Sequence, residues 1–238
     1  MKGLRDRVAM VTGANGNLGS EVAKAFYEAG ARLVLVGRKM EKIHSALPDL
    51  VSKDRVFVAP STDLTDERAV QELVDAVVER WTRIDVLANT VGGYRAGNPV
   101  YETPLETWDF MWRLNTRTVI LLNRAVVPVM LEDGYGKVIH TASRNALRGS
   151  RNAAAYSVSK AGVVRITESL SAEVKMKGIN VNCILPGTID TPDNREAMPN
   201  ADFSRWVDPT SIAQVFIFLA SDASKAIHGA AIPVYGLS

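Results

Sequence analysis

The sequence is poor in the residues that build disulfides and metal sites. Its 238 residues include one cysteine, Cys183, so no disulfide can form within the chain. Cys183 lies in an apolar run, which favours a buried small side chain over a nucleophile. The three histidines are scattered, and no cysteine, histidine or carboxylate cluster has the spacing of metal ligands. The sequence therefore predicts no metal site.

Long apolar runs and a strong charge of either sign are also missing. No run approaches the ~20 apolar residues that span a bilayer, and no apolar signal segment precedes the first predicted strand. The formal net charge of +2 is too small to indicate a nucleic acid or a membrane surface as partner. We expect a soluble, cytoplasmic protein whose partner is a small molecule.

What the sequence does contain is a regular alternation of short apolar strands and amphipathic helices. Strands are predicted at 7–12, 32–36, 55–59, 84–88, just before Ser143, at 180–185 and at 230–234. Helices are predicted at 20–29, 66–81, 105–130, from 152 onward and at 210–220. This order predicts an α/β fold with a single doubly wound parallel sheet flanked by helices, a Rossmann fold, in one domain over residues 1–238.

A glycine-rich turn joins the first predicted strand to the first helix. A turn of this kind lets backbone N–H groups approach an anion at the helix N-terminus, where a dinucleotide pyrophosphate commonly binds. The second predicted strand follows at the distance that a βαβ unit requires. The candidate contacts in this turn are Gly13, Asn15, Gly16, Asn17, Leu18 and Gly19.

The second predicted strand ends at Arg38, with no acidic residue beside it. A carboxylate in this place would accept a hydrogen bond from the 2′-hydroxyl of the adenine ribose, whereas a guanidinium suits a 2′-phosphate. Arg38 therefore favours NADP(H) over NAD(H).

A third motif combines Ser143, at the end of a predicted strand, with Tyr156 and Lys160 on the helix that follows. Four residues separate the tyrosine from the lysine, which places both on one helix face. We expect the ammonium group to lower the pKa of the Tyr156 phenol, which makes this phenol a candidate proton donor and Ser143 a second hydrogen-bond donor. The tyrosine–lysine spacing alone also occurs on solvated helix faces.

These motifs together resemble the short-chain dehydrogenase/reductase family over essentially the full length of the chain. Tyr156 follows Ser143 by 13 positions, which is the usual separation in that family. The residues that carry the resemblance occur in the order of the family: Thr12, Gly13, Gly19, Asp63, Asn89, Gly92, Asn115, Ser143, Tyr156, Lys160, Pro186 and Gly187.

The resemblance implies a catalytic tetrad of Asn115, Ser143, Tyr156 and Lys160. Tyr156 would be the general acid or base, Ser143 would hold the substrate oxygen, and Lys160 would bind the nicotinamide ribose. Asn115 would hold a water that links Lys160 to solvent. Further implied cofactor contacts are Asp63, Leu64, Asn89, Val91, Thr141, Pro186, Gly187 and Ile189. The resemblance also implies a homotetramer, assembled partly through the helices at 105–130 and 153–177.

Two positions depart from the family pattern. Asn17 replaces the usual glycine of the turn, and we expect the turn to survive because asparagine tolerates a left-handed backbone. The usual Asn-Asn-Ala-Gly stretch is Asn89-Thr90-Val91-Gly92, which keeps the first asparagine and the glycine.

Substrate selection is expected in the loops at 94–104, 144–155 and 188–208. Four arginines there either bind an anionic substrate, such as a keto acid or a phosphopantetheine-linked acyl group, or are solvated or at a subunit interface. Aromatic residues could also line a pocket, although the helical spacing of Trp108 and Trp112 is more typical of core. The arginines are Arg95, Arg144, Arg148 and Arg151, and the other aromatic residues are Tyr94 and Tyr101.

The favoured function is an NADP(H)-dependent reductase of ketones or aldehydes, or a dehydrogenase of secondary alcohols. A 3-oxoacyl carrier-protein reductase is the first alternative. The segment at 188–206 also resembles a loop of dihydropteridine reductases, but those enzymes prefer NADH and lack the serine of the tetrad. A nucleotide-sensing protein without turnover is the remaining alternative, and the complete tetrad speaks against it.

Overall fold

The computed structural model describes residues 3–237. Within this range seven strands form one parallel sheet in the order β3-β2-β1-β4-β5-β6-β7. They are β1 (Val8–Thr12), β2 (Arg32–Val36), β3 (Val56–Val58), β4 (Val86–Asn89), β5 (Gly136–Thr141), β6 (Ile179–Pro186) and β7 (Ala231–Val234). The predicted α/β fold with a doubly wound parallel sheet is confirmed.

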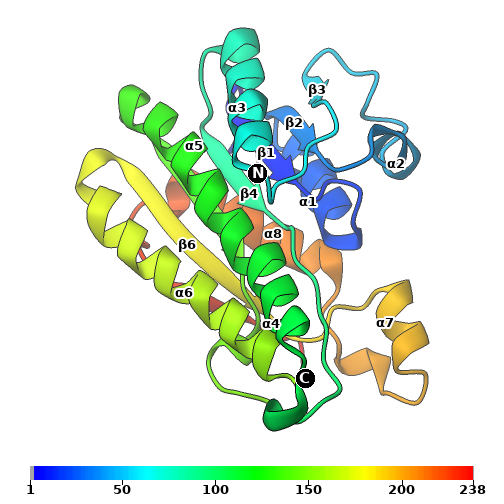
Figure 1. Cartoon of the computed structure of the whole chain (residues 1–238). Helices are drawn as coiled ribbons and strands as arrows, with labels where there is room; N and C mark the ends of the chain where they lie inside the picture. Colours follow the sequence, from blue (N-terminus) through cyan, green and yellow to red (C-terminus); the bar gives the residue numbers. More distant parts are fainter. Residues whose placement is uncertain (1–2, 238) are drawn as a thin grey trace.

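Helices cover both faces of this sheet (Figure 1). Successive strand residues point to opposite faces: Ala9 and Val11 pack with one group of helices, while Val8 and Met10 pack with the other. The first group is α1 (Asn17–Glu28), α2 (Met40–Ala46) and α8 (Pro209–Ala220). The second group is α3 (Glu67–Trp81), α5 (Thr118–Asp133) and α6 (Ala154–Val174).

The order of the strands locates the ligand crevice. β1 pairs with β2 on one side and with β4 on the other. The order in which the chain adds strands to the sheet therefore reverses between β1 and β4. In doubly wound sheets a crevice opens at such a point, beyond the carboxyl ends of the strands. The loops that carry most of the predicted site residues follow the ends of β1 to β6.

The helix predicted at 105–130 is interrupted. It begins as α4 (Leu105–Met111), continues as a π-helical segment, η2 (Trp112–Arg117), and resumes as α5. Asn115 lies in the π-helical segment, where its side chain bonds to Gly93. A π-helical segment changes the local helix register without interrupting the helical pattern, which explains why the sequence predicted one continuous helix.

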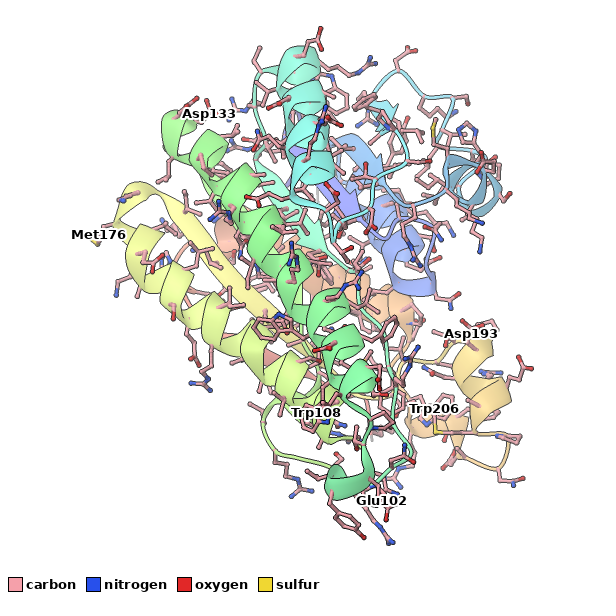
Figure 2. All side chains as sticks on the ribbon, viewed as in Figure 1. Glu102, Trp108, Asp133, Met176, Asp193 and Trp206 are labelled. Atoms are coloured by element: carbon pink, nitrogen blue, oxygen red, sulfur yellow. The ribbon has the colours of Figure 1, made fainter. Side chains whose placement is uncertain are left out.

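The remaining differences concern short elements. The structure adds α2 after Arg38 and α7 (Pro192–Ala197) within the segment predicted as a polar loop at 188–208. The side chain of Thr191 accepts a hydrogen bond from the N–H of Asn194 and so caps α7. Figures 1 and 2 show α7 and the following turn, which carry Asp193 and Trp206, projecting from the edge of the molecule. Short 3₁₀ turns occur at η1 (Val100–Glu102), η3 (Arg144–Ala146), η4 (Lys175–Lys177), η5 (Phe203–Arg205) and η6 (Asp222–Ser224).

Candidate active site

The turn between β1 and α1 depends on two of its glycines. Gly13 has a φ of +69°, a left-handed conformation that side chains disfavour. A Cβ atom on Gly19 would lie 2.1 Å from the carbonyl oxygen of Gly13, so this close approach requires glycine. No side chain caps α1 at Gly16, which leaves helix N–H groups available to an anion.

Asn17 is the first residue of α1. It is absent from the left-handed residues among positions 3–237. The turn therefore accommodates Asn17 because the position is helical, and not because asparagine tolerates a left-handed backbone, as the sequence analysis expected.

A cavity of about 570 Å³, here called the Arg38 cavity, lies beside this turn. Three exposed cations line it: Arg38, Lys39 and Lys42. The two lysines were not predicted as cofactor contacts, although the basic pattern from Arg38 to Lys42 was a usable signal. Of the predicted cofactor contacts, the Arg38 cavity brings together Gly13, Asn15, Gly16, Arg38, Asp63, Leu64 and Val91.

Asp63 is the acidic residue in the lining of the Arg38 cavity. Its Oδ1 accepts hydrogen bonds from the N–H and the hydroxyl of Thr65, both at 2.9 Å. The backbone bond from Thr65 is the largest cause of a lowered Asp63 pKa, and the Arg38 cation adds to it. The carboxylate therefore stays charged, but the charge of the cavity remains positive because three cations face one acid.

Asn89, predicted as a cofactor contact, ties three strands together. Its Oδ1 accepts from the Thr12 hydroxyl at 2.7 Å and from the N–H of Val91 at 3.2 Å. Its backbone oxygen accepts from the Thr141 hydroxyl at 2.9 Å. The side chain is buried and lines neither of the two large cavities described here.

A second cavity of about 570 Å³, the Tyr156 cavity, lies on the other side of the crevice. Thr90 and Gly92 line both cavities, so the two are neighbours. The predicted residues that line the Tyr156 cavity are Leu18, Thr141, Ser143, Tyr156, Lys160, Pro186, Gly187 and Ile189. Four predicted residues, Asn17, Gly19, Asn89 and Asn115, line neither.

Ser143, Tyr156 and Lys160 come together in the Tyr156 cavity as predicted. Ser143 follows β5, and its side chain lines the same cavity as that of Tyr156. Lys160 is buried, and its Nζ donates to the carbonyl oxygen of Thr141 at 2.8 Å. The two hydroxyl groups thus face the same space, with a cation behind them.

The pKa values of this group differ from the sequence-based expectation. Burial raises the pKa of Tyr156, although the neighbouring Ser143 hydroxyl acts in the opposite direction. Burial also lowers the pKa of Lys160 to about 8. The expectation that Lys160 lowers the pKa of Tyr156 is therefore wrong for this structure. Burial of the phenol is the largest cause of the raised pKa, and the Lys160 ammonium, which donates to Thr141, is not among the causes.

Asn115 is buried beside the same group of residues. Its Oδ1 accepts from the N–H of Gly93 at 2.9 Å, and its Nδ2 donates to Ser159 Oγ at 3.0 Å. A Cβ atom on Gly92 would lie 2.8 Å from Lys160 Nζ and 3.1 Å from Asn115 Oδ1, so the two polar atoms flank Gly92. Asn115 links α6 to the loop after β4.

The four loop arginines lie in different surroundings in the structure. Arg144 lines the Tyr156 cavity, whereas Arg148 and Arg151 do not. The Arg95 guanidinium lies 3.9 Å from the ring centroid of Phe110 and borders another cavity of about 230 Å³.

The aromatic residues that could line a pocket also differ in position and exposure. Tyr94 lines the Tyr156 cavity, and its ring contacts that of Tyr156. Tyr101 is 85% exposed and lines neither large cavity. Trp112 is 49% exposed, so its expected place in the core is wrong, and Trp108 is half-buried. Further residues of the Tyr156 cavity that the sequence analysis did not single out are Asn145, Ser150, Asn194 and Met198.

Residues 3–237 contain neither a helix suited to cross a membrane nor a side-chain cluster suited to hold a metal ion. None of their helices has the length and apolar character needed to cross a membrane. No group of three or more histidine, cysteine, aspartate or glutamate side chains in this range is placed to hold a metal ion.

Comparison with known proteins decides the family. The sequence model described as short chain dehydrogenase matches residues 7–202. The chain belongs to the short-chain dehydrogenase/reductase family. It is thus an oxidoreductase of a type that acts on alcohols or ketones with a nicotinamide cofactor, NAD(H) or NADP(H).

Individual short-chain dehydrogenases/reductases are similar along the whole chain. The BbsD subunit of (2S)-[(R)-hydroxy(phenyl)methyl]succinyl-CoA dehydrogenase from Thauera aromatica is 31% identical, with 98% of this chain and 97% of that protein covered. L-sorbose reductase from Gluconobacter frateurii, solved with NADPH and L-sorbose, has a TM-score of 0.89 at 30% identity, covering 99% and 97%. Levodione reductase has a TM-score of 0.90 at 29% identity, covering 98% and 97%.

Proposed function

We propose that the protein is an NADP(H)-dependent oxidoreductase that interconverts a ketone or aldehyde and the corresponding alcohol, with Tyr156 as general acid and base. The observation that carries this proposal is that Ser143 and Tyr156 line one cavity, which the buried Lys160 also lines. Two hydroxyl donors that converge on one space suit a carbonyl oxygen, which gains negative charge as it is reduced.

The crevice fits a dinucleotide. The close contact of Gly19 with Gly13 leaves no room for a side chain in the turn, and α1 offers uncapped N–H groups for a pyrophosphate. The Arg38 and Tyr156 cavities adjoin at Thr90 and Gly92, so an extended ligand can reach from one into the other. A bound nicotinamide cofactor would supply or accept the hydride.

The residues of the Tyr156 cavity would hold the substrate and move the proton. Ser143 and Tyr156 would donate hydrogen bonds to the carbonyl oxygen, and Tyr156 would transfer its proton to that oxygen during reduction. In the reverse direction Tyr156 would accept the alcohol proton. Lys160 would hold the ribose hydroxyls, and Asn115 would keep the loop after β4 in contact with α6 beside Lys160.

The preference for NADP(H) rests on the Arg38 cavity. Arg38, Lys39 and Lys42 line it, and Asp63 is held by Thr65. A 2′-phosphate would find cationic partners there. L-sorbose reductase, a structural neighbour at 30% identity, was solved with NADPH, which is in accord with this preference.

Assembly into a homotetramer stays a prediction, as does the cytoplasmic location. Apolar side chains exposed along α4, η2 and α6 support association through these helices. Phe110, Trp112 and Val158 are 40%, 49% and 55% exposed. Sedimentation analysis of the protein at several concentrations tests the tetramer.

Replacement of Tyr156 by phenylalanine tests the proposed function. Tyr156→Phe removes the proton donor but keeps the ring, so turnover of NADPH with a panel of ketones should fall by about a hundredfold or more. NADPH binding, followed by fluorescence, should remain within about threefold of the original protein. Turnover that survives Tyr156→Phe contradicts the assignment of Tyr156, and a protein that binds neither NADPH nor NADH contradicts the proposed function.

A further inference from the structure

The Tyr156 cavity has an unbalanced charge. Among the described residues that line it, Lys160 and Arg144 are cationic, and none is an aspartate or a glutamate. Asp190, next to the lining residue Ile189, is already paired with both Nε and Nη2 of Arg195, at 2.6 and 2.7 Å. The cavity therefore offers positive charge that its own lining does not neutralise.

Of these two cations, Arg144 is the one that is not committed to the catalytic group. Lys160 is buried and donates to Thr141, and under the proposed function it binds the cofactor. Arg144 is exposed and forms no ion pair within residues 3–237. Its guanidinium lies 5.7 Å from the ring centroid of Tyr235, in a cation–π contact.

The position of Arg144 in the chain places it close to the reacting group. It directly follows Ser143 and is the first residue of η3, so the two Cα atoms are about 3.8 Å apart. Both side chains line the same cavity. A substrate whose oxygen reaches Ser143 and Tyr156 would thus place a group a few carbon atoms away within reach of Arg144.

The rest of the lining suits a polar molecule. Asn145, Ser150, Thr188 and Asn194 supply hydrogen-bonding groups, and Met198 supplies an apolar contact. The other loop arginines do not share this place. Arg95 is held over Phe110, and Arg148 is exposed in the same loop as Arg144 but outside the cavity.

We propose that the substrate carries an anionic group, a carboxylate or a phosphate, a few carbon atoms from its carbonyl, and that Arg144 binds this group. The guanidinium donors match the oxygens of either anion. The inference rests on the proposed function, because it uses the position of the carbonyl between Ser143 and Tyr156. It assigns Arg144 to substrate selection and leaves proton transfer to Tyr156.

Matched pairs of charged and neutral carbonyl compounds test the proposal. The pairs are acetoacetate and methyl acetoacetate, levulinate and methyl levulinate, and dihydroxyacetone phosphate and dihydroxyacetone. For each compound, kcat/KM with NADPH is measured, together with calorimetric binding to the protein saturated with NADP⁺. The variants are Arg144→Gln, Arg144→Lys and, as the matched control, Arg148→Gln.

We expect the charged member of at least one pair to be preferred by about tenfold to a hundredfold, the range for a hydrogen bond to a charged group. The carboxylate pairs and the phosphate pair then identify the anion. Arg144→Gln should reduce the preference to about one, because turnover of the charged member falls more than turnover of the neutral member. Arg144→Lys should retain part of the preference, and Arg148→Gln should retain all of it.

Three results overturn the proposal: no preference for a charged member in turnover or in binding, a preference that survives Arg144→Gln, or an equal loss in Arg148→Gln. Failure of the proposed function gives a different result. In that case nucleotide binding is absent or Tyr156→Phe keeps its turnover, whatever residue stands at position 144.

Discussion

The ring of Tyr94 meets the ring of Tyr156 edge to face, with centroids 4.8 Å apart and planes inclined at 77°. Tyr94 follows two glycines at the carboxyl end of β4 and lines the same cavity as Tyr156. Its own side chain is 66% exposed, so it covers the phenol of Tyr156 from the solvent side. We therefore expect Tyr94 to position the ring of the proposed proton donor.

Truncation of Tyr94 should therefore impair turnover without affecting the cofactor. An edge-to-face pair contributes about 0.5–1.5 kcal/mol, so Tyr94→Ala should lower kcat/KM with the best ketone by up to about tenfold. Tyr94→Phe keeps the ring and should stay within about twofold. Tyr101→Ala, in the same loop but 85% exposed, is the control. A similar loss in Tyr101→Ala, or an unchanged Tyr94→Ala, would show that the ring contact is unimportant.

We expect Lys160 to lower the free energy of unfolding, although turnover requires it. Burial lowers its pKa from 10.5 to about 8, so between these pH values the unfolded chain holds the proton more tightly than the folded protein. The cost of the buried ammonium is thus complete below pH 8 and disappears as the pH rises toward 10.5. Lys160→Met should abolish turnover yet raise the free energy of unfolding at pH 7, on the order of 2 kcal/mol.

Denaturant unfolding of both proteins from pH 6 to pH 10 measures this effect. The difference in free energy of unfolding between Lys160→Met and the original protein should decrease above pH 8. A difference that does not vary with pH would mean that the bond from Lys160 to Thr141, and not the solvation of the ammonium, governs stability at this site.

The fold and the order of the motifs could be predicted because they depend on local patterns. The sequence itself contains the alternation of strands and helices, the turn with Gly13 and Gly19, and the tyrosine four residues before a lysine. Their convergence follows from a general property of parallel sheets, whose carboxyl ends share one edge.

What could not be predicted depends on contacts between distant segments. The π-helical segment around Asn115 reflects bonds to Gly93 and Ser159, neither of which is visible in the helical pattern. The pKa of Tyr156 depends on how completely the phenol is buried, and spacing carries no information on burial. The different surroundings of Arg144 and Arg95 likewise became apparent only in the folded chain.

Arg38 should control the choice of nucleotide. Arg38→Asp replaces the proposed partner of the 2′-phosphate with a carboxylate, which repels phosphate and accepts from a 2′-hydroxyl. NADPH affinity should fall by about tenfold to a hundredfold while NADH affinity rises or stays constant. Fluorescence titration with each nucleotide measures the ratio.

Arg32→Asp, at the amino end of β2, makes the same charge change away from the cavity and should leave the nucleotide ratio intact. If Arg32→Asp and Arg38→Asp shift the ratio equally, general electrostatics, and not contact with the 2′-phosphate, explains the preference. If neither variant shifts it, Arg38 does not select the cofactor.

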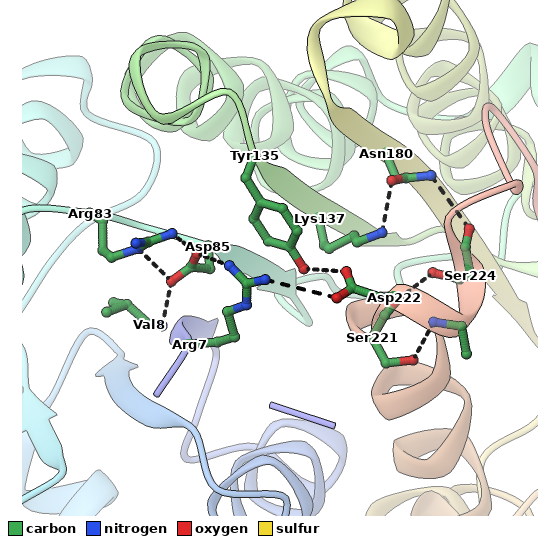
Figure 3. A network of polar contacts seen from close by, with 11 residues as sticks. Arg7, Val8, Arg83, Asp85, Tyr135, Lys137, Asn180, Ser221, Asp222 and Ser224 are labelled. Atoms are coloured by element: carbon green, nitrogen blue, oxygen red, sulfur yellow. Dashed lines mark hydrogen bonds and ion pairs between the residues drawn. The ribbon is translucent and has the colours of Figure 1, made fainter. Parts of the chain in front are cut away.

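At the opposite end of the sheet, Asp85 is the buried centre of a polar network (Figure 3). Its carboxylate accepts from the N–H of Val8 at 2.8 Å, from Arg7 Nη1 at 3.0 Å and from Arg83 Nε at 3.0 Å. Both arginines keep partial contact with water, whereas the carboxylate is 1% exposed. The carboxylate therefore depends on these donors for its solvation, and β1 and β4 are joined through it.

Asp85→Asn should therefore lower the free energy of unfolding by about 3 kcal/mol, because it removes the buried half of two ion pairs. Asp222→Asn is the matched control within the network: Asp222 accepts from the Tyr135 hydroxyl at 3.0 Å and lies 3.9 Å from Arg7 Nη2, but it is 70% exposed. Exposed pairs contribute less than about 1 kcal/mol. Chemical denaturation compares the two variants, and equal losses of free energy of unfolding would refute the view that burial of Asp85 makes it the centre of the network.

NADPH affinity of folded Asp85→Asn should be unchanged, because Asp85 precedes the amino end of β4 and the cavities lie beyond the carboxyl ends of the strands.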